Sequence, residues 1–345
     1  MKTRLPTLIL ILCLLGCVNL SFFFGPFTRF ERDTMLELRN MYQEWKKQTY
    51  IPDLEKKAHA GDELSQYRYA FTFLKKGHGT YDQDKAIYWF EKSGDNGYLD
   101  GYHKIAYGLD NGTFGFDTNY DPDKILVEKY YRKAADKGFA KSQNNLAILL
   151  MNKYGENADL EEVQKLRISS AEGGDLYGIH NLGTVYMYGK NGFEKDLEKA
   201  LYWFEKAYYR DYQPVRMLAN MAWIYAQRKG PDYNSRKAGL FYWKAARRGN
   251  TYAMKHVADA FWYKYYGYPR DRDKAMEWYV KAAEGGYEKA QEALGHIYKD
   301  KMERTTDPER KEKYRTKAIT WFEKSAEQGN AEATTLLNKL KKQEN

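Results

Sequence analysis

The sequence predicts an all-α protein, a right-handed α/α solenoid of about seven two-helix repeats. The first observation is a phrase rich in aromatic, alanine and lysine residues, such as KAIYWFEKSGDNG and KAMEWYVKAAEGG, which recurs along the chain. The second is that these phrases close at intervals of 36 to 43 residues, the period of helical repeat proteins. The third is that only 8 prolines occur among 345 residues, which suits long stretches of helix.

The composition narrows the class of protein further. Hydrophobic residues make up 43% of the chain and charged residues 30%, which excludes a multi-spanning membrane protein. An aromatic content of 16% excludes a disordered chain. The net charge of +9 is modest and both signs are interspersed, so no nucleic-acid partner is expected.

The second helix of each repeat, helix B, is predicted to end at a closing residue. Glycine suits this position because it adopts the left-handed turn that stops a helix. The closing residues are Gly61, Gly97, Gly138, Gly174, Asp211, Gly249, Gly286 and Gly329. Asp211 is the exception, and Tyr212-Gln213-Pro214 after it is expected to shift the next helix by two residues and to kink the array.

Three columns define helix B. A large side chain stands eight residues before the closing residue, and a small or β-branched one lies three residues earlier on the same helix face. Four residues before that stands an Asp or Asn suited to capping the first amides of a helix. The large column is Trp89, Tyr130, Leu166, Trp203, Phe241, Trp278 and Trp321. The capping column is Asp82, Asp123, Asp159, Asp196, Asn234 and Asp271.

The first helix, helix A, carries small residues where it must approach its neighbours closely. Those nine positions after the closing residue are Ala70, Ala106, Ala147, Gly183, Ala258 and Gly295. Because two helices cannot bury both faces alone, the repeats must stack. They are predicted to occupy residues 55–330, with a C-terminal capping helix in 331–345 and a long loop from Gly108 to Pro122 in the second repeat.

The N-terminus predicts export. Lys2 and Arg4 precede the apolar run Leu5–Leu15, and Leu14-Leu15-Gly16-Cys17 then resembles a bacterial lipoprotein lipobox. Residues 1–17 are therefore expected to be a signal peptide, with Cys17 the lipidated residue of the mature chain. Val18 after it favours, by the same resemblance, the outer membrane.

An alternative for the N-terminus stays open. Leu8–Phe27 is about long enough to span a bilayer, so an uncleaved inner-membrane anchor is the second prediction. Both predictions, the lipoprotein and the uncleaved anchor, place the rest of the chain on the periplasmic side. Residues 18–54 are expected to form a tether and an N-terminal capping helix.

No motif for catalysis, metal or cofactor stands out. The only cysteines are Cys13 and Cys17, and no two of the six histidines have metal-ligand spacing. Asp117 to Glu128 partly matches a calcium loop, but Pro122 replaces the required glycine. We therefore expect no enzyme activity, no cofactor and no metal.

The repeat columns resemble the Sel-one-like repeat family, whose α/α units are related to tetratricopeptide repeats. The resemblance covers about residues 55–340. It implies a protein-binding solenoid, because exported members of the family act as adaptors, envelope scaffolds and immunity proteins. A lipoprotein with these repeats resembles the periplasmic immunity proteins that are paired with phospholipase-type effectors of type VI secretion.

The resemblance also implies which surface binds a partner. In tetratricopeptide-like solenoids helix A lines the concave groove, and its exposed positions lie six, ten and thirteen residues after each closing residue. The predicted partner-binding groove is Tyr67, Phe71, His103, Tyr107, Asn144, Met151, His180, Met187, Trp223, Lys255, Asp259, Trp262, Glu292 and His296. Tyr, Trp, His and Met in such a groove are typical interface anchors.

The sequence thus predicts a non-enzymatic, membrane-anchored lipoprotein whose partner is another protein. The favoured function is immunity, in which the chain binds a secreted antibacterial effector and occludes its active site. The alternative is a periplasmic adaptor or scaffold for envelope assembly, polysaccharide export or signalling.

Overall fold

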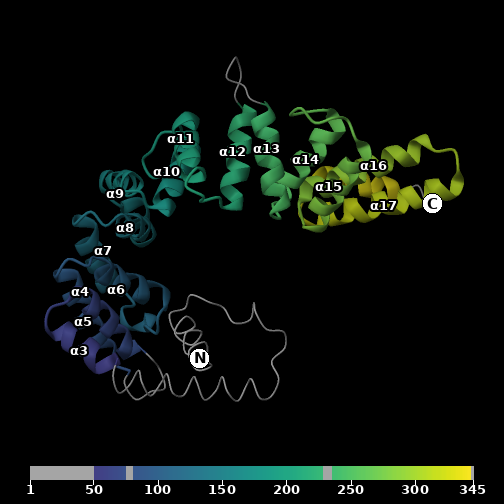
Figure 1. Cartoon of the computed structure of the whole chain (residues 1–345). Helices are drawn as coiled ribbons and strands as arrows, with labels where there is room; N and C mark the ends of the chain where they lie inside the picture. Colours follow the sequence, from purple (N-terminus) through teal and green to yellow (C-terminus); the bar gives the residue numbers. More distant parts are fainter. Residues whose placement is uncertain (1–49, 75–80, 228–234, 343–345) are drawn as a thin grey trace, which may run out of the picture. The chain divides into compact units, whose positions relative to one another are not determined.

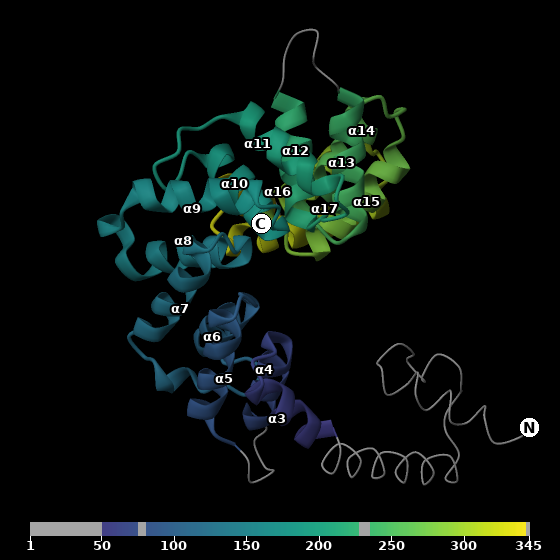
Figure 2. The same cartoon turned by 60° about the vertical axis from the view of Figure 1, so that its left-hand side comes forward.

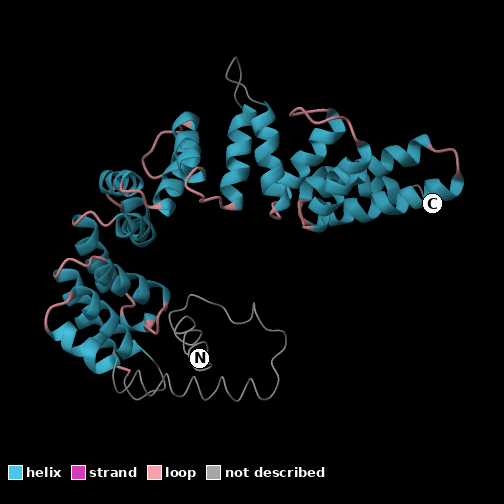
Figure 3. Cartoon of the chain, viewed as in Figure 1, coloured by secondary structure: helices cyan, strands magenta, loops and turns pink. Residues whose placement is uncertain are grey.

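The computed structural model in Figure 1 describes residues 50–74, 81–227 and 235–342. These residues form sixteen α-helices and three short 3-10 helices, with no strand among them (Figure 3). The predicted signal peptide, Cys17, the tether and the N-cap Asn234 lie outside the described residues.

The helices follow the predicted two-helix order, with seven pairs between one leading and one closing helix. The leading helix is α3 (Ile51–His59), and the closing helix is α18 (Ala331–Lys342). The pairs are α4 (Glu63–Ala70) with α5 (Gln83–Asp95), α6 (Asp100–Asn111) with α7 (Ile125–Asp136), α8 (Ala140–Tyr154) with α9 (Leu160–Glu172), α10 (Leu176–Tyr188) with α11 (Leu197–Tyr208), α12 (Val215–Gln227) with α13 (Ser235–Arg247), α14 (Thr251–Tyr263) with α15 (Arg272–Glu284), and α16 (Glu288–Arg304) with α17 (Pro308–Glu327). The 3-10 helices are η3 (Phe71–Leu74), η4 (Thr118–Tyr120) and η5 (Gly155–Asn157).

The chain divides into two compact units, residues 1–173 and 174–345. In the first unit each helix from α3 to α9 packs against the next, and in the second the same holds from α10 to α18. Figure 2 shows the helices from a second side. Each unit is therefore a stack of two-helix repeats, as the period predicts.

The closing glycines adopt the predicted left-handed turn, with φ between 84° and 109° at the seven positions. Asp211, which replaces glycine once, takes the same region at φ 64°. After Gly174 the next helix begins two residues later, at Leu176, whereas after Asp211 it begins four residues later, at Val215. The predicted shift of two residues is confirmed.

Aspartates cap the B helices as predicted, with one correction. Asp82, Asp196 and Asp271 each accept a hydrogen bond from the amide three residues on, and Asp159 caps α9 in the same way. The prediction for Asp123 is wrong, because Asp121 accepts the amides of Ile125 and Val127 instead.

The loop of the second repeat is shorter than predicted. Gly108 belongs to α6, which continues to Asn111. The chain then turns at Gly112 and brings Phe116 back onto the helix, where its ring is buried. A Cβ on Gly108 would meet that ring at 2.2 Å, so glycine is required there by close approach.

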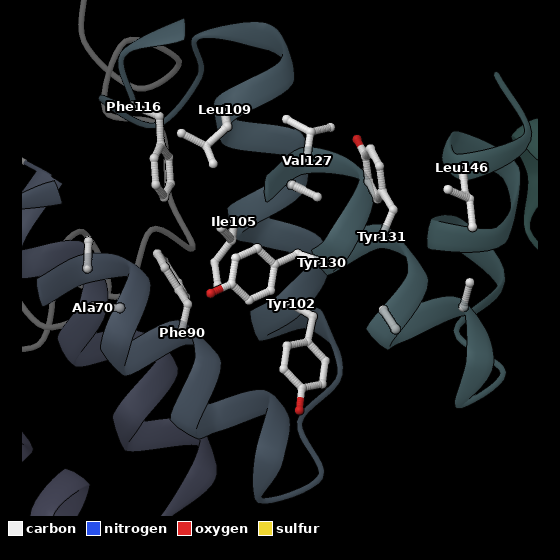
Figure 4. Packing of buried hydrophobic residues seen from close by; sticks show 14 of the residues in the cluster. Ala70, Phe90, Tyr102, Ile105, Leu109, Phe116, Val127, Tyr130, Tyr131 and Leu146 are labelled. Carbon is white, nitrogen blue, oxygen red and sulfur yellow. The ribbon is translucent and has the colours of Figure 1, made fainter. Parts of the chain in front are cut away.

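The deepest aromatic column stands seven residues before the closing residue, one place beyond the predicted column. Its rings are buried in six repeats, at Phe90, Tyr131, Phe204, Tyr242, Tyr279 and Phe322. The predicted column is less uniform, since Trp89, Tyr130 and Phe241 are buried whereas Leu166, Trp203, Trp278 and Trp321 are half-buried. Figure 4 shows Phe90 and Tyr131 in the core of the first unit, with Ala70 beside Phe90.

The buried ring of helix B packs on the small residue of helix A in the same repeat. A Cβ on Gly183 would meet Phe204 at 2.7 Å, and one on Gly295 would meet Phe322 at 2.5 Å. The remaining small residues of this column are fully buried alanines: Ala70, Ala106, Ala147 and Ala258. Small side chains thus set the distance between the two helices of a repeat.

One repeat breaks the ring column. Arg167 on α9 stands where the other repeats have a ring, and it is only 7% exposed. Its Nε has no hydrogen-bond partner among the described residues, and burial lowers the pKa of its guanidinium. A buried nitrogen without a hydrogen-bond partner costs free energy of folding, so this position of α9 is less favourable than a buried ring would be.

The ring column predicts that two adjacent aromatic residues of α11 contribute differently to the free energy of unfolding. Phe204→Ala removes a fully buried ring and should lower the free energy of unfolding by about 3–5 kcal/mol. Trp203→Ala is the matched control, since Trp203 is half-buried, and should cost less. Urea denaturation of both variants measures the difference, and a larger loss for Trp203→Ala would contradict the assignment of the core.

Candidate functional site

An open pocket of about 710 Å³ lies in the second unit, against α14, α15, α16 and the start of α18. Five predicted groove residues line it: Lys255, Asp259, Trp262, Glu292 and His296. The first three are separated by four and three residues, which places them on one face of α14. The last two lie four residues apart on α16. The repeat register therefore brings residues of successive A helices to one surface.

Asp259 holds one side of the pocket in place. Its carboxylate accepts hydrogen bonds from Lys255 Nζ at 2.7 Å and from the Tyr279 hydroxyl at 2.6 Å. Burial and the charge of Asp259 raise the pKa of Tyr279, so the hydroxyl keeps its proton and remains the donor. This network joins α14 to α15 with its charges already paired.

Aromatic side chains supply the apolar part of the pocket. Trp262 meets Tyr279 edge to face with ring centroids 6.2 Å apart, and the Arg272 guanidinium lies 5.2 Å from the Trp262 ring centroid. Tyr263 and Tyr265 stack at 5.6 Å, and both are exposed. Tyr and Trp side chains that remain accessible to solvent are enriched in protein interfaces.

Glu292, His296 and Glu332 gather at the α16 side of the pocket. One candidate ligand atom of each side chain lies within 4.8 Å of the other two. His296 Nε2 is 3.5 Å from Glu332 Oε1, and Lys289 Nζ is 3.1 Å from Glu292 Oε2. Spacing between histidines does not predict this group, because its other two members are carboxylates, one from the same helix and one from α18.

Comparison with known proteins identifies the repeats. A family model described as Sel1 repeat matches residues 64–98, 100–139, 176–212, 215–250, 251–287 and 315–330, which is more than half of the chain. The chain belongs to the Sel1 repeat family. Sel1 repeats mediate protein–protein interaction, and α8 with α9, which carries Arg167, forms the one complete helix pair outside the matched segments.

Three similar proteins match different shares of the chain. Chitin synthase regulatory factor 3 of Schizosaccharomyces pombe is 26% identical over 243 residues, 69% of this chain and 25% of that protein. The Sel1-repeat-containing protein YjcO of Escherichia coli K12 is 29% identical over 158 residues, 44% of this chain and 63% of that protein. The crystal structure of c5321, a protective antigen of uropathogenic Escherichia coli strains with an SLR fold, is 26% identical with a TM-score of 0.65. That match covers 84% of this chain and 59% of the other. The chain therefore spans less than two thirds of each of these proteins.

The remaining predicted groove residues lie on or directly after the A helices of other repeats. Tyr67, Phe71, Tyr107, Met151, His180 and Trp223 are half-buried. The expected exposure is wrong for His103, Asn144 and Met187, which are buried. His103 shows the physical reason, because its Nδ1 lies 3.0 Å from Ser142 Oγ on the next A helix and its ring packs against Tyr131 and Phe139.

Both predicted forms of membrane attachment, the lipid on Cys17 and the span at residues 8–27, lie outside the described residues. In the described ranges no helix combines the length and the apolar character that crossing a bilayer requires.

Burial of His103 predicts a loss of stability in acid. Burial lowers its pKa to about 4, with Asp100 raising it and Lys104 and Lys141 lowering it further. In the unfolded chain His103 takes up a proton below about pH 6.5, as an ordinary histidine does. In the folded chain its imidazole stays neutral until about pH 4. The stability is therefore present above pH 6.5 and is lost as the pH falls towards 4, by about 2 kcal/mol between pH 7 and pH 5.

His103→Gln should remove this part of the pH dependence, because glutamine does not titrate. The free energy of unfolding is measured by urea denaturation at pH 7 and pH 5. His59→Gln is the control, since His59 is exposed on α3. Equal pH dependence in the wild type and in His103→Gln would show that His103 is not kept neutral by burial.

Proposed function

We propose that this Sel1 repeat chain is a non-enzymatic binding protein of the bacterial envelope and that the pocket on α14 and α16 is the centre of its partner surface. The observation that carries the proposal is that five residues predicted from repeat register line one open pocket. The family supports binding of another protein as the general activity.

The chemistry of the pocket suits a folded protein partner. Trp262, Tyr263 and Tyr265 offer aromatic contact area, which is the usual source of interface hot spots. Lysine and aspartate on α14 are already paired within the pocket, so binding does not have to order them first. Side chains of both charges line the pocket, which favours a partner with a mixed polar surface.

The same pairing argues for occlusion rather than catalysis. The raised pKa of Tyr279 keeps its hydroxyl protonated as a donor to Asp259, so this hydroxyl does not act as a base at neutral pH. Covering a partner is therefore the mode of action that we propose.

We propose further that the chain is exported, that Cys17 carries the lipid, and that the outer membrane is its site. The lipobox-like motif supports this. Sel1 repeats on such an anchor match the plan of immunity lipoproteins, so the favoured partner is a secreted antibacterial effector of the phospholipase type. The chain would cover the active site of that enzyme in the periplasm.

A second function is supported by one relative. The Schizosaccharomyces pombe protein is named as a regulatory factor of chitin synthase, and the chain covers a quarter of it. An adaptor or scaffold for envelope assembly, polysaccharide export or signalling would use the same surface, with a synthesis or export component as partner.

The pocket assignment predicts that one tryptophan matters for binding and another does not. Trp262→Ala should weaken partner affinity at least about tenfold, because a buried aromatic anchor contributes 2 kcal/mol or more, as interface hot spots do. Trp278→Ala is the matched control. Both tryptophans are half-buried beside a cationic side chain, Arg272 for Trp262 and Lys281 for Trp278, but Trp278 does not line the pocket.

The partner is first captured with the tagged full chain from the envelope fraction and identified by mass spectrometry. Binding of that purified partner to the two variants is then measured by calorimetry. Equal affinities of Trp262→Ala and Trp278→Ala would place the partner surface elsewhere.

Immunity predicts protection in the periplasm. Cells that express the captured effector there should survive when the chain is co-expressed and die with Trp262→Ala, because the active site is then uncovered. Cys17→Ser should release the chain from the membrane fraction while the purified protein still inhibits the effector. Capture of a non-lethal synthesis or export component instead would favour the scaffold function.

A further inference from the structure

We infer that Glu292, His296 and Glu332 form a binding site for a divalent transition metal of the zinc class. Two carboxylates and an imidazole are ligands that zinc accepts, and three protein ligands leave a fourth position for water or a partner's group. The inference does not depend on the proposed function, since it concerns the chain alone.

The helix geometry brings the first two ligands together. Glu292 and His296 lie four residues apart on α16, so their side chains leave the same face one turn apart. The His296 ring also packs edge to face against Phe322, with centroids 5.4 Å apart. This contact restricts the ring on one side.

The third ligand comes from the capping helix and is held near by contacts that do not involve the metal. Gln328, just before α18, donates to the Gln291 side chain on α16 at 2.7 Å. This places the first turn of α18 beside α16, and Glu332 Oε1 lies 3.5 Å from His296 Nε2. The two helices are therefore already close enough for one ion to bridge them.

The distances require only side-chain rotation. A tetrahedral ion with bonds of about 2.1 Å separates its ligand atoms by about 3.4 Å. The pair formed by His296 and Glu332 already has this spacing, and the whole group falls within 4.8 Å. Glu292 and Glu332 are half-buried and exposed, respectively, so their carboxylates have room to turn.

The local charge is also suitable. Lys289 pairs with one oxygen of Glu292, and a carboxylate has a second oxygen that remains available to a metal. Two carboxylates balance the double charge of the ion. A bound ion would join α16 to α18 in the wall of the same pocket that Lys255 and Trp262 line.

The chain contains its own matched control. Glu55 and His59 form the same four-residue pair on α3, with His59 Nε2 3.9 Å from Glu55 Oε1. In the part of the chain that the structure describes, no third ligand joins that pair, because the group on α16 and α18 is the one cluster of three. The pair on α3 therefore tests whether two ligands suffice.

The experiment is a titration of the metal-free, purified full chain with ZnCl₂ by calorimetry, with cobalt chloride absorption as a second readout of coordination. We expect one zinc ion per chain and an affinity that falls at least about tenfold in His296→Ala and in Glu332→Gln. His59→Ala should bind zinc as the wild type does. Zinc should raise the melting temperature of the wild type and of His59→Ala but not of His296→Ala.

Absence of zinc binding by the wild type at millimolar concentration, or equal affinity in His296→Ala, would overturn the inference. Circular dichroism of each variant verifies that the helices are retained. The outcome is separate from that of the proposed function, since Trp262→Ala should keep its zinc affinity while losing partner affinity.

Discussion

The contact on which the structure depends is that of one ring on one small residue. Six of the seven repeats bury a ring of helix B at this position, and the ring lies against a small residue of helix A where the contact is closest, as Phe204 does on Gly183 and Phe322 on Gly295. Because neither side can grow without a clash, this contact fixes the distance between the helices. The remaining face of helix A is then free to carry polar and aromatic residues, among them Lys255, Asp259 and Trp262.

The period of the sequence was enough to predict the repeats, their number, the closing glycines and most of the caps, because these depend on local backbone chemistry. It did not identify the innermost ring column, since Trp203 and Phe204 are adjacent and both large. Capping by Asp121 in place of Asp123 depends on how the chain turns at Pro122 and Lys124, which is not a local helix signal. His103 was expected at the surface, and only the packing of the next A helix explains its burial.

In the candidate site, too, some residues could be predicted from spacing along one helix and others only from the packing of several helices. Register alone placed Lys255, Asp259, Trp262, Glu292 and His296 on A helices, and the structure gathers them at one pocket. Tyr279 enters from helix B and Glu332 from α18, and no spacing rule along one helix would find them. Spacing along one helix therefore predicts which residues share a face of that helix. It does not predict which residues of other helices lie beside them.

Arg167 has a consequence for how the chain can be divided. It occupies the ring position of the last repeat before residue 173, where the two compact units meet in sequence. α9 ends at Glu172 and α10 begins at Leu176, so a break after Gly173 leaves every helix pair intact. Each half would keep the helix pairs of its own repeats, so separate expression of the two halves divides the chain between repeats and not within one.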